Sequence, residues 1–326
     1  MFIEQAFKVR HEWWCYVVGV IIAIAGIFIF SVPHAAAIAI KQFKGDVDIS
    51  KLEDINYIMT LFDSNINLIL ILLPFVGGLI CLLLAVKFLH NQSLIQLTTS
   101  RKKIDWKRFW FVFLFWGIIS SGLMVLDYYM SPEDYVVNFN LKPFVILCVI
   151  AIVLVPLQTS FEEYLFRGYL MQGLGVITKR KWIPLIVTSL VFGSLHIANP
   201  EVEKLGYIIM VYYIGTGLFL GIMTLMDEGM ELSLGFHAAN NLFTALLVTA
   251  DWTAFQTHSV LKDMSEPTAA GVMDIFMPVF VMFPILLFIF AKKYKWTNWN
   301  EKLFGRVEEP KVEVEVENEN NEIGRL

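Results

Sequence analysis

Long apolar runs restrict the fold of this 326-residue chain more than any other feature. A helix of about 20 apolar residues crosses a bilayer, and eight stretches approach that length. The runs are continuous and lack the alternation of barrel strands, so helices are the expected spanning form. With 57% hydrophobic and 17% charged residues, a water-soluble globule is excluded. The sequence predicts an all-α, polytopic membrane helix bundle of about eight transmembrane helices, with spans near 14–32, 66–86, 109–126, 143–171, 182–197, 205–226, 232–250 and 271–291.

Lysine and arginine placement predicts the orientation, because basic links stay on the cytoplasmic side. The links after the second, fourth and eighth spans are basic, and eight crossings put all three on one side together with both termini. The predicted location is the cell membrane, multi-pass, with cytoplasmic N- and C-termini. The acidic links 127–135 and 199–204 then lie outside. The basic links contain Lys87, Arg101, Lys102, Lys103, Lys107 and Arg108; then Lys179, Arg180 and Lys181; then Lys292, Lys293 and Lys295.

The chain divides into four parts by composition. Residues 1–142 hold the N-terminal spans, an external loop over 33–65 and a basic cytoplasmic link; 143–250 form the expected catalytic core; 251–307 hold the last span and its flank; and 308–326 form an acidic tail that we expect to be disordered. That tail accounts for the net charge of −5, so no nucleic-acid partner is expected. The basic N-terminus, apolar core and small residues near 34–39 also resemble a signal peptide, but the apolar stretch is long and we favour a retained first span.

Few ionisable side chains interrupt the spans, and each costs about 2.5 to 3.5 kcal/mol on insertion scales. Glu163 and Arg167 are four residues apart on one helical face, in the favourable acid-to-base order, so they can neutralise each other. Glu162 projects about 100° away from Glu163 and remains as the acid left over. These three residues alone are equally compatible with a structural ion cluster.

Two further spans carry polar side chains. His196 follows Phe192 by one helical turn in the fifth predicted span. His237 and Asn241, in the seventh, are also one turn apart and share a face. Each motif alone is weak, but three helices that each supply polar groups at helical spacing indicate a common site.

The chemistry of this set points to hydrolysis. A buried carboxylate beside imidazoles can remove a proton from water, and His or Asn donors can stabilise the oxyanion that forms. Alternatively, Glu162, His196 and His237 could bind a catalytic zinc ion with an open position for water. The sequence leaves both routes open, and the zinc-protease pattern His-Glu-x-x-His is absent.

The ordered motifs Glu162-Glu163-x-x-x-Arg167, Phe192-x-x-x-His196 and His237-x-x-x-Asn241 resemble those of the CAAX-protease and bacteriocin-processing family, also called the Abi family. The resemblance covers about 143–250. It implies an intramembrane endopeptidase whose catalytic residues are Glu162, His196, His237 and Asn241, supported by Glu163, Arg167 and Phe192. Glu162 would activate water, His196 would assist or bind metal, and His237 with Asn241 would form an oxyanion site.

The expected partners are the membrane and a peptide or membrane-protein substrate. The composition is typical of a prokaryotic protein, for which peptide maturation, immunity to a self-made peptide or cleavage of a membrane regulator are the expected roles by analogy. Two other functions compete with the peptidase. The same cluster could hold together a membrane scaffold or immunity protein, or relay protons in a transporter, although no internal repeat supports a transporter.

Overall fold

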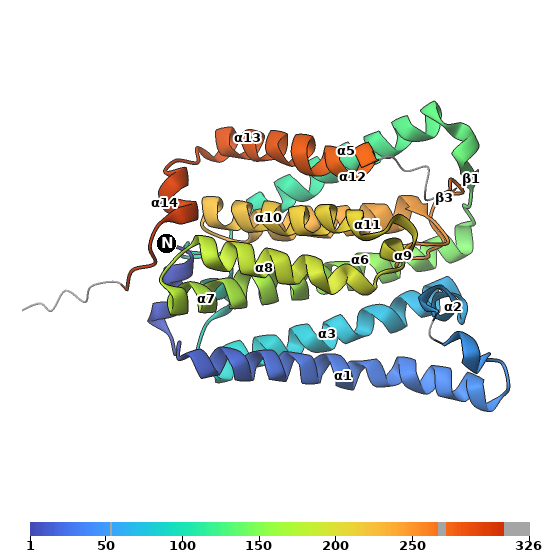
Figure 1. Ribbon diagram of the computed structural model, residues 1–326, viewed down its shortest axis with the longest axis horizontal. Coiled ribbons are helices and arrows are strands. Elements are labelled where there is room, and N and C mark those ends of the chain that lie inside the picture. Colours follow the sequence, from blue (N-terminus) through green and yellow to red (C-terminus); the bar gives the residue numbers. More distant parts are fainter. Residues whose placement is uncertain (53, 267–271, 310–326) are drawn as a thin grey trace, which may run out of the picture.

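The protein, described by a computed structural model over residues 1–52, 54–266 and 272–309, is a bundle of helices that run along its long axis (Figure 1). Six of the described helices are long and apolar enough to cross a membrane. The predicted helical membrane bundle is therefore confirmed, but the count of eight is not. The fifth and seventh predicted spans form the shorter helices α8, of 13 residues, and α11, of 17 residues.

The described helices fall into the long bundle members and short connecting helices. The long members are α1 (Trp13–Phe43), α3 (Ser64–Phe88), α5 (Trp106–Met130), α6 (Leu141–Glu163), α8 (Trp182–Ser194), α10 (Met210–Asp227), α11 (Glu231–Leu247) and α13 (Phe283–Tyr294). The short helices are α2 (Ile55–Thr60), α4 (Leu94–Thr98), α7 (Met171–Thr178), α9 (Pro200–Leu205), α12 (Val272–Met277) and α14 (Trp299–Phe304). Residues Tyr164–Leu170 and Pro278–Met282 are π-helical.

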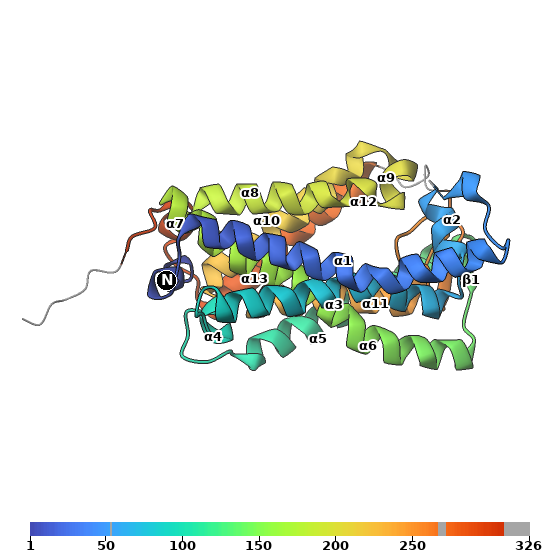
Figure 2. The same cartoon turned by 90° about the horizontal axis from the view of Figure 1, so that it is seen from below.

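Helices α1 and α3 lie side by side along one face of the bundle (Figures 1 and 2). Two glycines allow this approach, since a Cβ at Gly26 would lie 2.4 Å from the carbonyl oxygen of Gly77. The external loop was predicted to begin at residue 33, but α1 continues through Pro33 to Phe43. Three alanines follow this proline, and their high helix propensity accounts for the longer helix.

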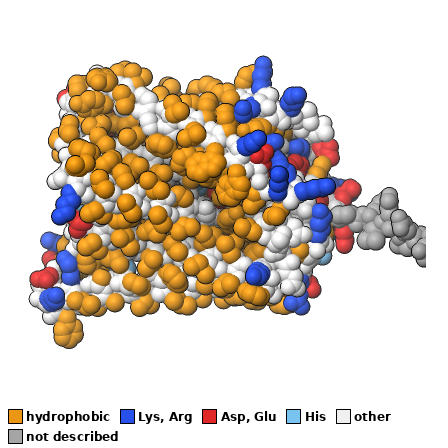
Figure 3. Space-filling view, turned by 180° about the vertical axis from the view of Figure 1, so that it is seen from behind, with side chains coloured by type: hydrophobic (Ala, Val, Ile, Leu, Met, Phe, Trp, Pro, Cys, Tyr) orange, Lys and Arg blue, Asp and Glu red, His pale blue; other side chains and the backbone are white. Residues whose placement is uncertain are grey.

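The predicted basic links meet at one end of the bundle, beside the N-terminus (Figure 1). Arg101 forms ion pairs with Asp227 at 2.9 Å and with Glu231 at 3.1 Å, which joins the α4–α5 link to the turn between α10 and α11. The guanidinium of Arg108 lies 4.2 Å from the ring centre of Tyr294, at the end of α13. On the face in Figure 3, charged side chains gather near the two ends and hydrophobic side chains cover the area between them, as a membrane band requires.

Three short strands form a small sheet at the opposite end, in the order β1 (Tyr135–Val137), β3 (Leu261–Asp263) and β2 (Val248–Thr249). β1 pairs antiparallel with β3, with Val136 opposite Lys262, and β2 pairs with β3 in parallel. Both acidic links belong to this end, because Ala254 N, in the loop that joins β2 and β3, donates a 2.8 Å hydrogen bond to Glu201 Oε1. The predicted tail lies almost wholly outside the described residues, which end at 309.

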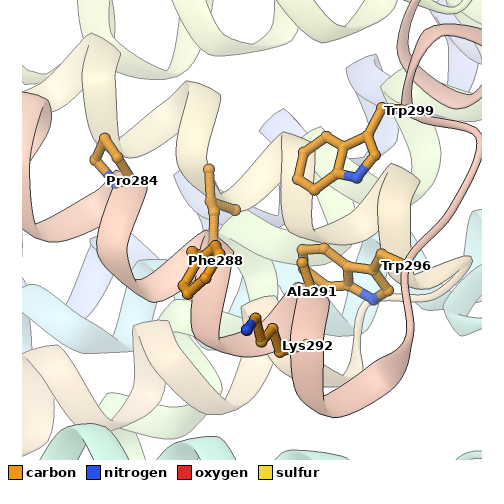
Figure 4. Close-up of a pocket in the computed structure, with 7 residues that line it drawn as sticks. Pro284, Phe288, Ala291, Lys292, Trp296 and Trp299 are labelled. Atoms are coloured by element: carbon orange, nitrogen blue, oxygen red, sulfur yellow. The ribbon is translucent and has the colours of Figure 1, made fainter.

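A pocket of about 530 Å³ lies between α13 and α14 (Figure 4). It is lined by apolar and aromatic residues and by one lysine, and it contains none of the predicted site residues. The lining residues are Pro284, Leu287, Phe288, Ala291, Lys292, Trp296 and Trp299.

Candidate active site

The polar residues of the first motif lie where α6 changes its winding. α6 ends at Glu163, and the π-helical segment Tyr164–Leu170 begins at the next residue. Such π-helical turns are rare and often mark functional sites. Glu163 and Arg167 are both completely buried, and Arg167 Nη1 lies 3.0 Å from Glu163 Oε1. The predicted pairing of these two residues is confirmed.

This ion pair connects three helices. Arg167 Nη2 donates a 3.2 Å hydrogen bond to the carbonyl oxygen of Gly217 on α10. His237 Nδ1, on α11, lies 2.9 Å from Glu163 Oε1. The Arg167 guanidinium also lies 4.2 Å from the ring centre of Phe192 on α8, a distance typical of a cation–π contact. Glu163 thus holds the Nδ1 edge of the His237 ring, so the Nε2 edge points elsewhere.

Glu162 lies on the other side of the His237 ring. Its Oε2 is 3.5 Å from His237 Nε2, and its Oε1 accepts a 2.6 Å hydrogen bond from Gln158 Nε2. Two acceptors cannot face each other favourably, and Nδ1 already donates to Glu163. When Glu162 is ionised, a proton on His237 Nε2 therefore makes this contact attractive. Glu162, which was predicted to lack an arginine partner, is thus held in place by neighbours other than Arg167.

Asn241 lies one turn beyond His237 on α11, as predicted. Its Nδ2 is 3.5 Å from His237 Nε2 and donates a 3.3 Å hydrogen bond to Gln158 Oε1. The Gln158 amide therefore joins Glu162 to Asn241. Gln158 was not among the predicted site residues, although it precedes Glu162 by four residues and its position on the same helical face could have identified it.

His196 joins this group only through aromatic neighbours. It lies in a 3-10 turn after α8, where its Nδ1 contacts the carbonyl oxygen of Phe192 at 2.8 Å. The ring of Phe192 lies between the two histidine rings. Its centre is 4.9 Å from the centre of the His196 ring and 6.0 Å from that of the His237 ring. Tyr213 on α10 stacks on His196 at 4.4 Å, a contact that no periodicity in the sequence indicated. Glu162, His237 and Asn241 thus form a direct cluster, and His196 lies at its edge.

A second buried carboxylate lies near His196. Glu201 is largely buried on α9, and its Oε2 has no hydrogen-bond partner among the described residues. Burial raises the pKa of the Glu201 carboxyl, while the hydrogen bond from Ala254 N and the positive charge that His196 can carry lower it.

The side-chain positions decide whether a metal ion could be held among these residues. Within the described part of the chain, no three His, Cys, Asp or Glu side chains converge as ligands. His237 is engaged by Glu163 on one ring nitrogen, and His196 is separated from it by Phe192. The predicted set of Glu162, His196 and His237 therefore does not present a metal site in this arrangement.

These observations define a class of protein. It is a helical membrane bundle with a buried cluster of Glu, His and Asn side chains on α6 and α11. Residues 141–243 match the family model for Rce1-like proteins, described as type II CAAX prenyl endopeptidase Rce1-like. This match covers the region whose three motifs resemble the CAAX-protease and bacteriocin-processing family.

One curated relative has no assigned function. It is "Uncharacterized protein YyaK" of Bacillus subtilis (strain 168), 34% identical over 167 residues. That match covers 51% of this chain and 56% of the relative, so the similarity spans little more than half of each protein. No solved structure matches the chain.

Proposed function

We propose that the protein is an intramembrane endopeptidase in which Glu162 activates a water molecule. The observation that carries this proposal is the position of Glu162: its carboxylate is fixed by Gln158 and lies against the His237–Asn241 pair, while a separate arginine neutralises Glu163. A carboxylate that is oriented and not paired with an arginine is available as a general base. The Rce1-like domain supports the same reaction class.

In the proposed reaction, the Glu162 carboxylate takes a proton from water and the water oxygen forms a bond to the peptide carbonyl carbon. The carbonyl oxygen becomes an oxyanion, to which His237 Nε2–H and Asn241 Nδ2–H donate hydrogen bonds. When the C–N bond breaks, the amide nitrogen receives the proton from Glu162. A carboxylic acid and an amine leave, and Glu162 is again ionised. His196, whose Nδ1 is held by the Phe192 carbonyl, presents Nε2 as an assisting hydrogen-bond acceptor.

The proposed substrates are membrane-associated peptides or membrane proteins, because Glu162 lies in a helical segment that is long and apolar enough to cross a membrane. The protein is proposed to act in the cell membrane, with both termini in the cytoplasm.

A structural role is the alternative that a specific observation favours. Arg167 contacts Glu163 on its own helix segment and Gly217 on α10, while Glu163 also binds His237 on α11. These contacts would tie three helices together even without catalysis. These contacts involve Glu163 rather than Glu162. Substitutions of Glu163 therefore test the structural role, and substitutions of Glu162 test catalysis.

The oxyanion role is tested with Asn241→Ala in purified protein reconstituted in liposomes. Removing one oxyanion donor should lower kcat by about 10²- to 10³-fold for any peptide that the wild type cleaves. Asn67→Ala is the control, because Asn67 is a buried asparagine on α3 whose Nδ2 donates a 2.9 Å hydrogen bond to the Met59 carbonyl oxygen on α2 and not to a residue of the cluster. Product masses after incubation with a peptide library measure the cleavage. Equal effects of the two variants would contradict the oxyanion role, and absence of cleavage by the wild type would contradict the proposed function.

Treatment with a chelator tests the metal requirement in the same assay. The mechanism written above predicts unchanged cleavage after chelation. Loss of cleavage that added Zn²⁺ restores would instead assign Glu162, His196 and His237 as metal ligands.

A further inference from the structure

A second cavity, of about 650 Å³, lies toward the end of the bundle that carries the small sheet. Its size falls within the range of about 300 to 1,000 Å³ that is usual for ligand sites. Met124 on α5, Phe243 and Leu247 on α11, and Met282 after α12 supply apolar wall. Methionine side chains adapt to varied partners, so such a wall suits segments of different sequence.

Aspartates from separate parts of the chain complete the lining. Asp127 and Asp134 come from the end of α5 and the following turn, Asp263 from β3, and Asp274 from α12. None of the described residues that line the cavity is Lys, Arg or His. An apolar wall with four carboxyl groups beside it is complementary to a ligand that is apolar on one side and positively charged on the other.

The cavity is continuous with the catalytic helices. Trp116 on α5 donates to Asn240 on α11, and Asn240 Nδ2 donates a 3.3 Å hydrogen bond to Asn241 Oδ1. Ser120 and Thr244, both in the cavity lining, lie one turn further along these two helices. One turn corresponds to about 6 Å, so the cavity begins next to the amide pair that includes Asn241.

We propose that this cavity binds a cationic, amphipathic segment of the peptide substrate; this inference rests on the proposed endopeptidase function. Apolar side chains of the segment pack against α5 and α11, and its Lys or Arg side chains pair with the aspartates. The adjoining part of the peptide then reaches Asn241 and Glu162. The cavity thus determines substrate class, whereas the catalytic cluster performs hydrolysis.

Binding is measured with the Glu162→Gln protein in phosphatidylcholine nanodiscs, so that the readout is independent of cleavage. The probes are two fluorescent amphipathic peptides with the same apolar residues, one with Lys and the other with Gln at its polar positions. We expect the Kd of the Lys peptide to be lower by about tenfold, and the difference to shrink at high salt because exposed charges are screened.

Two sets of variants locate this preference. Asp127→Asn combined with Asp134→Asn keeps the hydrogen-bond acceptors but removes two charges, and it should abolish most of the difference between the peptides. Glu133→Gln, an exposed acid between them that does not line the cavity, should retain it. Leu247→Trp should weaken binding of both peptides by reducing the apolar space.

Equal Kd values for the Lys and Gln peptides would overturn the inference, as would a preference that survives the double Asn variant or is lost in Glu133→Gln. Binding no stronger than to protein-free bilayers would assign the cavity to lipid chains and would also overturn it. Wild-type protein that binds the Lys peptide selectively but cleaves no peptide would contradict the proposed function and leave the binding site standing.

Discussion

Arg167 is a completely buried cation among apolar helices, and its neighbours explain how it is tolerated. Glu163 neutralises it, the Gly217 carbonyl accepts from it, and the Phe192 ring lies against its guanidinium. Desolvation of both charges costs free energy, so the pair is a weak net source of stability while intact. Removing one partner lowers the stability of the fold, because the remaining charge stays buried without a counter-charge.

Arg167→Gln and Glu163→Gln should therefore each lower the free energy of unfolding by about 3 to 5 kcal/mol, since each leaves an uncompensated buried charge. Arg180→Gln is the control: Arg180 is exposed after α7, and its loss should have little effect. Thermal unfolding in detergent measures all three. Equal melting temperatures for the wild type and the Arg167 variant would mean that the buried pair does not stabilise the bundle.

At the scale of elements, the close packing of α1 on α3 depends on glycine. A Cβ at Gly26 would meet the Gly77 carbonyl oxygen and the Cys81 side chain at 2.4 and 2.7 Å, and the backbone contact cannot be relieved by a rotamer change. Small residues at such crossings let helices approach closely in membranes. This packing makes α1 part of the bundle.

Gly26→Ala should separate α1 from α3 and destabilise the protein by about 1 to 3 kcal/mol, the usual cost of overpacking. Gly122→Ala on α5 is the matched control, because an added Cβ there meets nothing within 4 Å. The control should leave the melting temperature unchanged or raise it slightly through better helix propensity. A Gly26 variant as stable as the control would show that the two helices can readjust.

The sequence predicted which segments form helices and which residues on α6 and α11 meet, since apolar runs and one-turn spacing determine both. It did not predict the continuation of α1 past Pro33, because the apolar run weakens there while helix propensity does not. The π-helical turn after Glu163 and the stacking of Tyr213 on His196 arise from tertiary packing, which periodicity does not encode. The shortness of α8 left the count of eight crossings unconfirmed.

At the scale of the whole molecule, the two ends differ in charge. The basic links share the end with the N-terminus (Figure 1). The other end holds Asp127 in the last turn of α5, Glu133 and Asp134 in the turn that follows, and Asp263 on β3. In the proposed orientation, the basic end faces the cytoplasm. The proposed substrate cavity then opens toward the outer side.

Cysteine labelling in intact cells tests this orientation, after Cys15, Cys81 and Cys148 have been replaced by Ala. Lys103→Cys in the basic link should resist an impermeant maleimide, and Glu133→Cys at the other end should react with it. Both positions are exposed, so a difference reports sidedness rather than burial. The reverse labelling pattern would invert the topology.

The hydrolysis rate of Glu162→Gln in correctly folded protein distinguishes a catalytic base at Glu162 from a carboxylate that belongs to a structural ion cluster. Glutamine keeps the size and can still hydrogen-bond to Gln158, but it cannot take a proton from water. We expect a melting temperature close to that of the wild type and a rate of peptide cleavage lower by about 10²- to 10⁴-fold. A folded Glu162→Gln protein that cleaves at the wild-type rate would show that Glu162 is not the base.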